Sequence, residues 1–146
     1  VDLEFRGFVY QRRLTCLSQY NYLIYSQRLN ENKEKIQEKI LKFFTEILQK
    51  KFNEFQCDNY VIDFALTQKN CSATNFDVDA MRVWVIELNP FMETTDGALF
   101  SWQHERDLLE GKSSSHLIFR LTERIRTGSW TMLPISIRQW IQQQNH

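Results

Sequence analysis

The sequence predicts an α+β domain in which a mainly antiparallel sheet is packed by one long helix. Two observations predict this class: several short segments alternate apolar and polar residues, and one long segment repeats apolar residues at helical spacing. The chain has 146 residues, the size of one domain with its own core. We therefore expect 1–146 to form a single domain. Because the chain starts without Met inside a predicted strand, we also expect a fragment of a longer protein.

The N-terminal segment predicts a β-hairpin. Residues 3–10 alternate, with Phe5 on one face of a strand and Glu4 and Arg6 on the other. A polar turn begins at Gln11, and residues 13–18 return as a second strand.

A long amphipathic helix is predicted over 31–55. Glutamates are interspersed among its lysines, which favours a solvated helix face over a nucleic-acid patch. The apolar residues step at three and four positions and form one stripe. Its members are Ile36, Ile40, Phe43, Phe44, Ile47, Leu48, Phe52 and Phe55.

Two further strands are predicted at 60–67 and 81–89, joined by a long polar hairpin loop. Alternation assigns residues of both strands to a face that carries carboxylates. These residues are Val61, Asp63 and Ala65 in the first strand, and Val83, Val85, Glu87 and Asn89 in the second.

The last third of the chain predicts shorter elements. Residues 98–102 are apolar and are expected to bury under the sheet, and a short helix over 103–110 closes at Gly111. A fifth strand is predicted at 116–121, and Pro134 begins a C-terminal helix.

Composition excludes several classes of function. Lys plus Arg equals Asp plus Glu at 18 each, so no net field draws the chain to nucleic acid or to a membrane surface. The three cysteines show neither zinc-ligand spacing nor a disulfide pattern, which fits a reducing, cytoplasmic setting. No apolar run approaches the roughly 18 residues that span a bilayer. We therefore expect no direct contact with nucleic acid and no membrane association.

The chemistry of the chain centres on Asp63, Glu87 and Asn89. Carboxylates are depleted in strands and costly to bury unpaired, yet these oxygen donors are predicted on one sheet surface. Such donors suit Mg²⁺, which completes its shell with phosphate oxygens and water. The alternative is that the carboxylates are edge-strand charges paired with Arg6, Arg82 or Lys69. Arg6 itself is a candidate either to contact a phosphate or to form a salt bridge with Glu4 or Glu87.

Several segments resemble the C-terminal half of the cell division cycle protein 123 family. The resemblance runs from about Glu4 to Trp102, and its most specific part surrounds the Asn-Pro-Phe sequence that begins at Asn89. The segments are EFRGFV, LSQYNY, YVIDF and VWVIELNPFMETTDGALFSW.

This resemblance implies an ATP-grasp C-terminal subdomain and an ATP- and Mg-dependent assembly chaperone. Members of the family help to assemble translation initiation factor 2 by binding its gamma subunit. In the family, metal-bound ATP is held by an aspartate in the YV-x-D strand and by an Asp-x-Asn pair before Pro-Phe. These positions fall here on Asp63, Glu87 and Asn89. Arg6 is assigned to the same nucleotide site not by the resemblance but as the candidate phosphate contact on the first predicted strand.

The chain departs from the family pattern at four points. The loop between the strands that carry Asp63 and Glu87 is longer than in the family. Glu87 replaces aspartate, which keeps the charge on a longer arm. Tyr20 stands where the family typically has arginine, so a cation near the nucleotide or partner is missing. Nothing in the chain resembles the first ATP-grasp subdomain, which supplies lysines and a phosphate-covering loop. We therefore expect this segment alone to bind ATP weakly or not at all.

Two other functions remain open from the sequence. One is an ATP-grasp ligase that forms an acyl phosphate, and the other is a nucleotide-free protein-interaction scaffold. The serine tract 113–115 beside His116 lacks the strained elbow of a nucleophile, and His104 is expected at the surface or at a helix cap.

Overall fold

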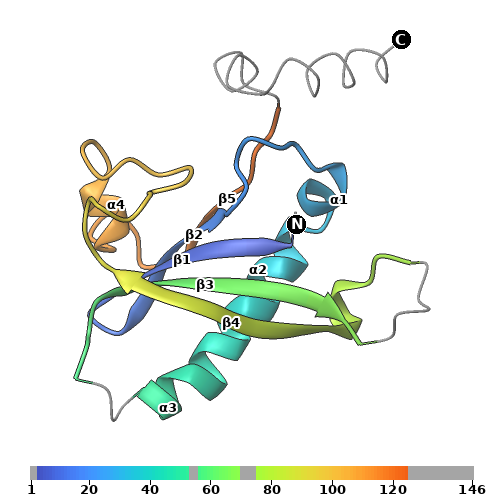
Figure 1. The fold of residues 1–146 in the computed structure, drawn as a ribbon, viewed down its shortest axis with the longest axis horizontal. Helices are drawn as coiled ribbons and strands as arrows, with labels where there is room; N and C mark the ends of the chain where they lie inside the picture. The colour runs from blue at the N-terminus through green and yellow to red at the C-terminus, as the bar shows by residue number, and fades with distance from the viewer. Residues whose placement is uncertain (1–2, 53–55, 70–74, 125–146) are drawn as a thin grey trace.

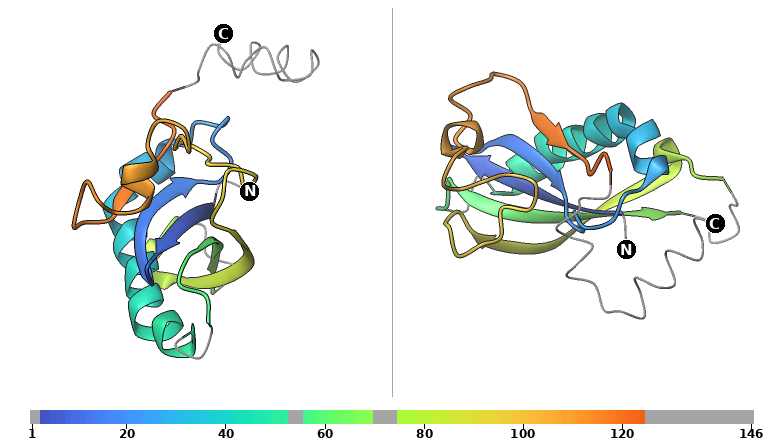
Figure 2. Two further views of the ribbon diagram at one scale, coloured as in Figure 1. Left: turned by 90° about the vertical axis from the view of Figure 1, so that its left-hand side faces the viewer. Right: turned by 90° about the horizontal axis from the view of Figure 1, so that it is seen from above.

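The computed structural model of the chain describes residues 3–52, 56–69 and 75–124. This part contains a five-stranded sheet in the order β4-β3-β1-β2-β5, with the main helix against one face (Figures 1 and 2). The strands are β1 Glu4–Tyr10, β2 Arg13–Gln19, β3 Tyr60–Gln68, β4 Met81–Pro90 and β5 Ile118–Arg120.

The sheet is mixed. The β1–β2, β1–β3 and β3–β4 pairs are antiparallel, whereas β5 runs parallel to β2. The predicted α+β class is confirmed, as are all five strands. The fifth strand is shorter than expected: of the predicted range 116–121, only Ile118–Arg120 forms β5. The predicted helix at Pro134 lies outside the described residues.

The predicted helix 31–55 is a series of short pieces that starts earlier. It consists of α1 Gln27–Glu31, α2 Lys33–Phe43, a π-helical turn η1 Phe44–Leu48, and α3 Gln49–Phe52. Residues 53–55, with the last member of the predicted stripe, lie outside the described part.

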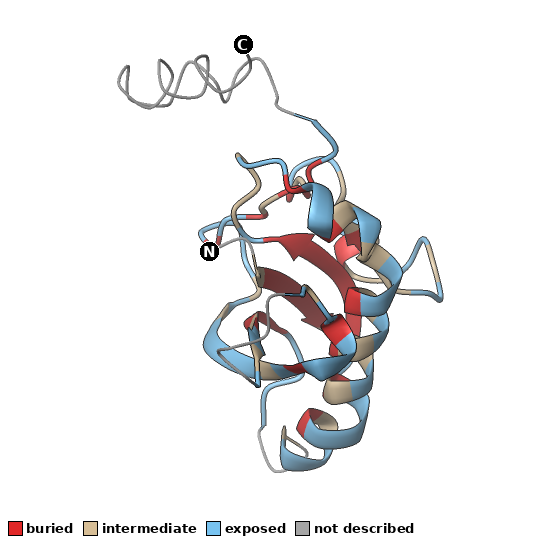
Figure 3. Ribbon diagram, turned by 90° about the vertical axis from the view of Figure 1, so that its right-hand side faces the viewer, coloured by how far each residue is buried: buried red, intermediate tan, exposed pale blue. Residues whose placement is uncertain are grey.

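The apolar stripe of this helix packs on the sheet and forms the larger core (Figure 3). Ile36, Ile40, Phe44 and Leu48 are buried, as predicted. Ile47 was predicted in the same stripe, but this is wrong, because its side chain is 42% exposed. A π-helical turn holds more residues than an α turn, so it brings Leu48 rather than its neighbour back over the sheet.

The predicted faces of β4 are wrong for its first half, because the strand contains a β-bulge. Asp63 pairs with Glu87 and Phe64 pairs with Val85, which leaves Ile86 as an extra residue in β4. The extra residue reverses the alternation on its N-terminal side. Val83 and Val85 were predicted on the carboxylate face, but they pair with Leu66 and Phe64 on the helix-covered face.

The second face of the sheet is covered in part by the chain that follows β4. Apolar residues of this segment pack on β1, β2 and β3 in a smaller core, so the predicted burial of 98–102 under the sheet is confirmed. The helix predicted at 103–110 is shorter, α4 Arg106–Leu109, and ends before Gly111 at a φ of 72°. The smaller core consists of Phe8, Cys16, Val61, Phe100, Trp102 and Leu109.

The loop between β3 and β4 contains one short element among its described residues. This is a 3₁₀ turn, η2 Val78–Ala80, whose Val78 reaches the larger core. No helix in the described part of the chain is long and apolar enough to cross a membrane.

Candidate functional site

A buried ion pair between Arg6 and Asp63 lies at the centre of the second sheet face. The Arg6 Nε and Nη2 groups donate to the two carboxylate oxygens of Asp63, each at 2.9 Å. Both residues are almost fully buried, Arg6 at 7% and Asp63 at 2% exposure. The hydrogen bonds that Arg6 donates to Asp63 raise the pKa of the Arg6 guanidinium above its ordinary value, although burial opposes this rise.

The sheet register explains why these two side chains meet. Arg6 on β1 lies directly opposite Asp63 on β3, and directly paired residues project from the same face. The predicted pairing of Asp63 with Arg6 is therefore confirmed. The prediction that Asp63 is an edge-strand charge is wrong, because β3 lies between β1 and β4 and the Asp63 side chain is buried. Glu4 and Glu87 were the expected salt-bridge partners of Arg6, but the guanidinium instead bonds Asp63.

The other two predicted site residues lie beside Asp63. Glu87 is its direct partner on β4, and Asn89 is two residues further along the same strand. The Asn89 Nδ2 group donates to the Asp63 carboxylate at 3.5 Å, the outer limit of a hydrogen bond. Glu87 is exposed and Asn89 is half-buried. The fold thus gathers Arg6, Asp63, Glu87 and Asn89 in one row across three strands.

The donor chemistry of this row fits a hard cation. A carboxylate has about four lone-pair sites, so Asp63 keeps acceptor capacity on both oxygens after Arg6 has bound. Glu87 and Asn89 add an exposed carboxylate and an amide oxygen, which Mg²⁺ accepts. The described residues contain no group of three or more His, Cys, Asp or Glu placed to hold a metal, and the predicted set has two carboxylates. Metal binding at these residues stays a prediction.

Two groups around Arg6 were missed by the sequence reasoning. The backbone carbonyl of Asp96 accepts a hydrogen bond from Arg6 Nη1 at 2.9 Å. The Tyr20 ring lies over the guanidinium, with its centroid 4.9 Å from Arg6 Cζ. The sequence offered one indication of the Tyr20 contact, because Tyr20 directly follows β2, the strand that pairs with β1. In the structure the Tyr20 N–H donates to the Glu4 carbonyl. No side-chain pattern could have shown the Asp96 carbonyl.

The loop that carries Asp96 is fixed by its own contacts. The Ala98 N–H donates to Asp96 Oδ1 at 2.8 Å, so the Asp96 side chain caps the start of the following segment. The Trp102 indole donates to the Thr95 carbonyl at 2.7 Å. The loop is therefore held against the sheet beside Arg6.

The weaker catalytic candidates gain no support. His116 and His104 are exposed, and each uses its backbone N–H to bond a neighbouring serine hydroxyl, Ser114 and Ser101 respectively. Neither contact activates a nucleophile, because a general base must act through its imidazole ring.

The fold of this chain is similar to solved α+β structures. The structure of Cdc123 from Schizosaccharomyces pombe matches with a TM-score of 0.62 and 28% identity, covering 84% of this chain and 42% of that one. A C-terminally truncated form of the same protein matches with a TM-score of 0.60, covering 82% and 40% of the two chains.

Sequence comparison identifies the family. The model of the D123 family matches residues 1–135, and the chain belongs to this family. The chain is 32% identical to the translation initiation factor eIF2 assembly protein of Xenopus laevis, over 70% of this chain and 26% of that protein. It is 31% identical to the protein of the same name from Danio rerio, over 75% of this chain and 27% of that protein. The chain thus spans about a quarter of these relatives.

Proposed function

We propose that this chain forms part of an ATP- and Mg-binding assembly chaperone for translation initiation factor 2, acting in the cytoplasm through contact with the gamma subunit. The observation that carries the proposal is the row Arg6–Asp63–Glu87–Asn89, in which an arginine, two carboxylates and an amide lie on adjacent strands. The names of the relatives support the assembly function.

In this proposal the four side chains have distinct roles. Asp63, Glu87 and Asn89 would hold Mg²⁺, which supplies charge neutralisation for the phosphates of bound ATP. Arg6 fixes the orientation of Asp63 by its two-pronged contact. An arginine has five N–H donors, and three of those on Arg6 are used within the described residues. The remaining donors would reach a phosphate oxygen.

We also propose the fold to be an ATP-grasp C-terminal subdomain. Such a subdomain would form one wall of a nucleotide site, and a second subdomain would form the other. On this view, the row lies on the sheet face that turns towards the nucleotide.

Calorimetric titration with ATP and Mg²⁺ tests the nucleotide site. It is carried out on the complete protein, because this segment alone is expected to bind ATP weakly or not at all. Glu87→Gln and Asn89→Ala avoid the buried ion pair, so they preserve the fold, and each is expected to weaken Mg·ATP binding by about tenfold. Glu93→Gln, on the exposed loop after β4, is the matched control and should leave the affinity unchanged. Equal affinities in all four proteins would contradict the site.

A nucleotide-free scaffold is the second candidate, and one observation favours it. Arg6 already neutralises Asp63 and bonds both of its oxygens, so the buried carboxylate is electrostatically satisfied without a metal. Co-elution with the purified gamma subunit, measured with and without Mg·ATP, separates the two candidates. The chaperone proposal predicts co-elution that depends on nucleotide, and the scaffold predicts the same co-elution in both conditions.

A further inference from the structure

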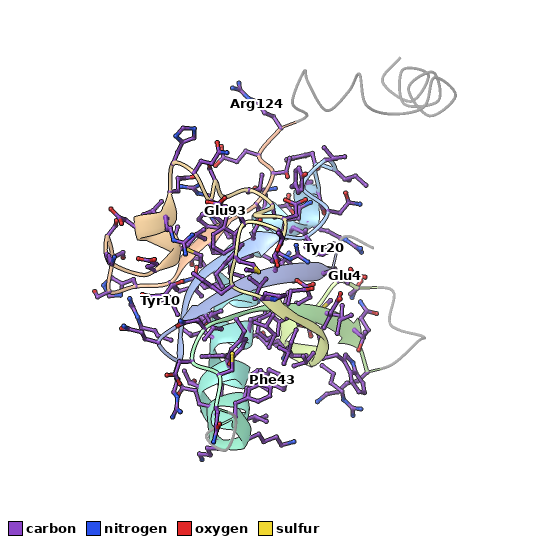
Figure 4. All side chains as sticks on the ribbon, turned by 60° about the vertical axis from the view of Figure 1, so that its left-hand side comes forward. Glu4, Tyr10, Tyr20, Phe43, Glu93 and Arg124 are labelled. Carbon is purple, nitrogen blue, oxygen red and sulfur yellow. The ribbon has the colours of Figure 1, made fainter. Side chains whose placement is uncertain are left out.

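A hollow with a volume of about 280 Å³ lies beside Arg6, on the side towards β2. Its polar lining comes from Glu4, Arg6, Tyr20, Asn21, Tyr22 and Asp96, and we call it the Tyr20 hollow. Glu4 and Tyr20 lie next to each other in Figure 4, where the start of β1 meets the end of β2. The row residues Glu87 and Asn89 lie in the other direction, on β4.

The charge of the Tyr20 hollow is negative. Arg6 contributes little net charge, because Asp63 compensates it through two bonds of 2.9 Å. Glu4 is half-buried, and its carboxylate has no ion-pair partner in the described part of the chain. The Asp96 carboxylate accepts from the Tyr22 hydroxyl at 3.3 Å and from the Ala98 N–H, which are both neutral donors. Neither carboxylate therefore forms an ion pair within the described part of the chain, although the Arg6 charge acts on Asp96 at longer range.

Two tyrosine side chains, Tyr20 and Tyr22, also line the hollow. Tyr20 is 40% exposed although its ring already stacks on the Arg6 guanidinium. Tyr22 is half-buried, and its hydroxyl is directed to Asp96. Tyrosine rings attract cations through their faces, and the attraction strengthens where water is partly excluded. A cavity that combines such rings with unpaired carboxylates matches an elongated cation better than an anion.

We infer that the Tyr20 hollow binds an arginine or lysine side chain of a protein partner. The stem of such a side chain would pack along the tyrosine rings while its charged end reaches Glu4 and Asp96. A phosphate or carboxylate would instead meet two carboxylates. The inference goes beyond nucleotide binding and relies on the proposed function only for the existence of a protein partner.

Nuclear magnetic resonance of the ¹⁵N-labelled protein tests this site with a capped Gly-Arg-Gly tripeptide. We expect saturable shifts at the amides of 4–6, 20–23 and 96–98, with a Kd on the order of 1 mM for one side chain. The same tripeptide with citrulline in place of arginine has the same shape without the charge, so it should not bind. Saturable shifts with citrulline, shifts centred elsewhere, or no saturation with arginine would each overturn the inference.

Two variants make the test specific. Glu4→Gln removes the unpaired carboxylate without touching the buried ion pair and should weaken tripeptide binding by about fivefold. Glu38→Gln removes an exposed carboxylate from α2 and should change nothing. Equal effects of the two variants would refute the assignment to the hollow. Glu4→Gln should leave Mg·ATP binding intact, so failure here and failure of the nucleotide site are distinguishable.

Discussion

The two faces of the sheet are stabilised in different ways. The helix-covered face is closed by apolar side chains from α2 and η1 that pack on β1 and β3. The second face is closed by apolar residues at one end and by the Arg6–Asp63 pair beside them. Apolar packing tolerates modest changes of shape, whereas a buried charge depends on its one partner. The second face is therefore the more fragile one, and it is the face that carries the chemistry.

The largest effect is expected from Asp63→Ala. This change leaves the Arg6 guanidinium buried without its counter-charge, which should cost about 4 kcal/mol of unfolding free energy. Asp58→Ala is the matched control, because it breaks an ion pair with Arg12 in which both side chains are more than half exposed. The control should cost below about 1 kcal/mol by urea denaturation. Similar losses in both variants would show that burial does not govern the cost.

A cavity on the helix-covered face should cost somewhat less. Ile40 is fully buried in the larger core, so Ile40→Ala is expected to lose about 3 kcal/mol, measured by the same denaturation. Ile47→Ala, seven residues further along, removes an exposed side chain and should lose below about 0.5 kcal/mol. A large loss for Ile47→Ala would place it in the core and contradict the π-helical turn.

Overfilling the same face should cost less again. A Cβ at Gly7 would lie 2.9 Å from Leu14 Cδ1, 2.9 Å from Phe64 Cε2 and 3.2 Å from Ile62 Cγ2. Gly7→Ala is therefore expected to destabilise the protein by about 2 kcal/mol, because three packed side chains must move. Thermal unfolding measures the loss, and an unchanged midpoint would show that this face is loosely packed.

The smallest effect concerns the exposed rim of the second face. Glu105 bonds Arg120 at 2.6 Å and 2.8 Å, and this contact lowers the pKa of the Glu105 carboxyl. A lowered pKa stabilises the fold above the unfolded-state value, and this stability is lost as the pH falls through the folded-state pKa. Glu105→Gln should cost about 1 kcal/mol at neutral pH, because the pair is partly exposed. The difference from the unchanged protein should vanish in acid, and a constant difference would exclude the charge as its cause.

Thiol reactivity gives an independent comparison of a buried and an exposed position. Burial raises the pKa of the Cys16 thiol to about 12, whereas Cys57 is exposed. In a Cys71→Ser background, a thiol reagent at mildly alkaline pH should modify Cys57 rapidly, and Cys16 only on unfolding, because the thiolate is the reactive form. Rapid modification of Cys16 in the folded protein would show that the smaller core opens.

The sequence allowed most of the elements to be predicted, since alternation and helical spacing are local properties. The carboxylate face of β3 and the position of Glu87 beside Asp63 followed from that alternation. The bulge at Ile86 and the π-helical turn at Phe44 did not follow, because each adds a residue without changing the composition of its segment. The choice of Asp63 as the partner of Arg6 depends on strand order, which local patterns do not encode.

The most direct test of the central claim is to locate the metal. Mn²⁺ replaces Mg²⁺ at oxygen sites and broadens nearby amide resonances, so it can be added with ATP to the ¹⁵N-labelled protein. The account predicts broadening centred on residues 63, 87 and 89, and a shift of this broadening to about tenfold higher metal–nucleotide concentration in Asn89→Ala. Broadening centred elsewhere, or broadening that persists unchanged in Asn89→Ala, would contradict the proposal that the row beside Arg6 holds a nucleotide-bound metal.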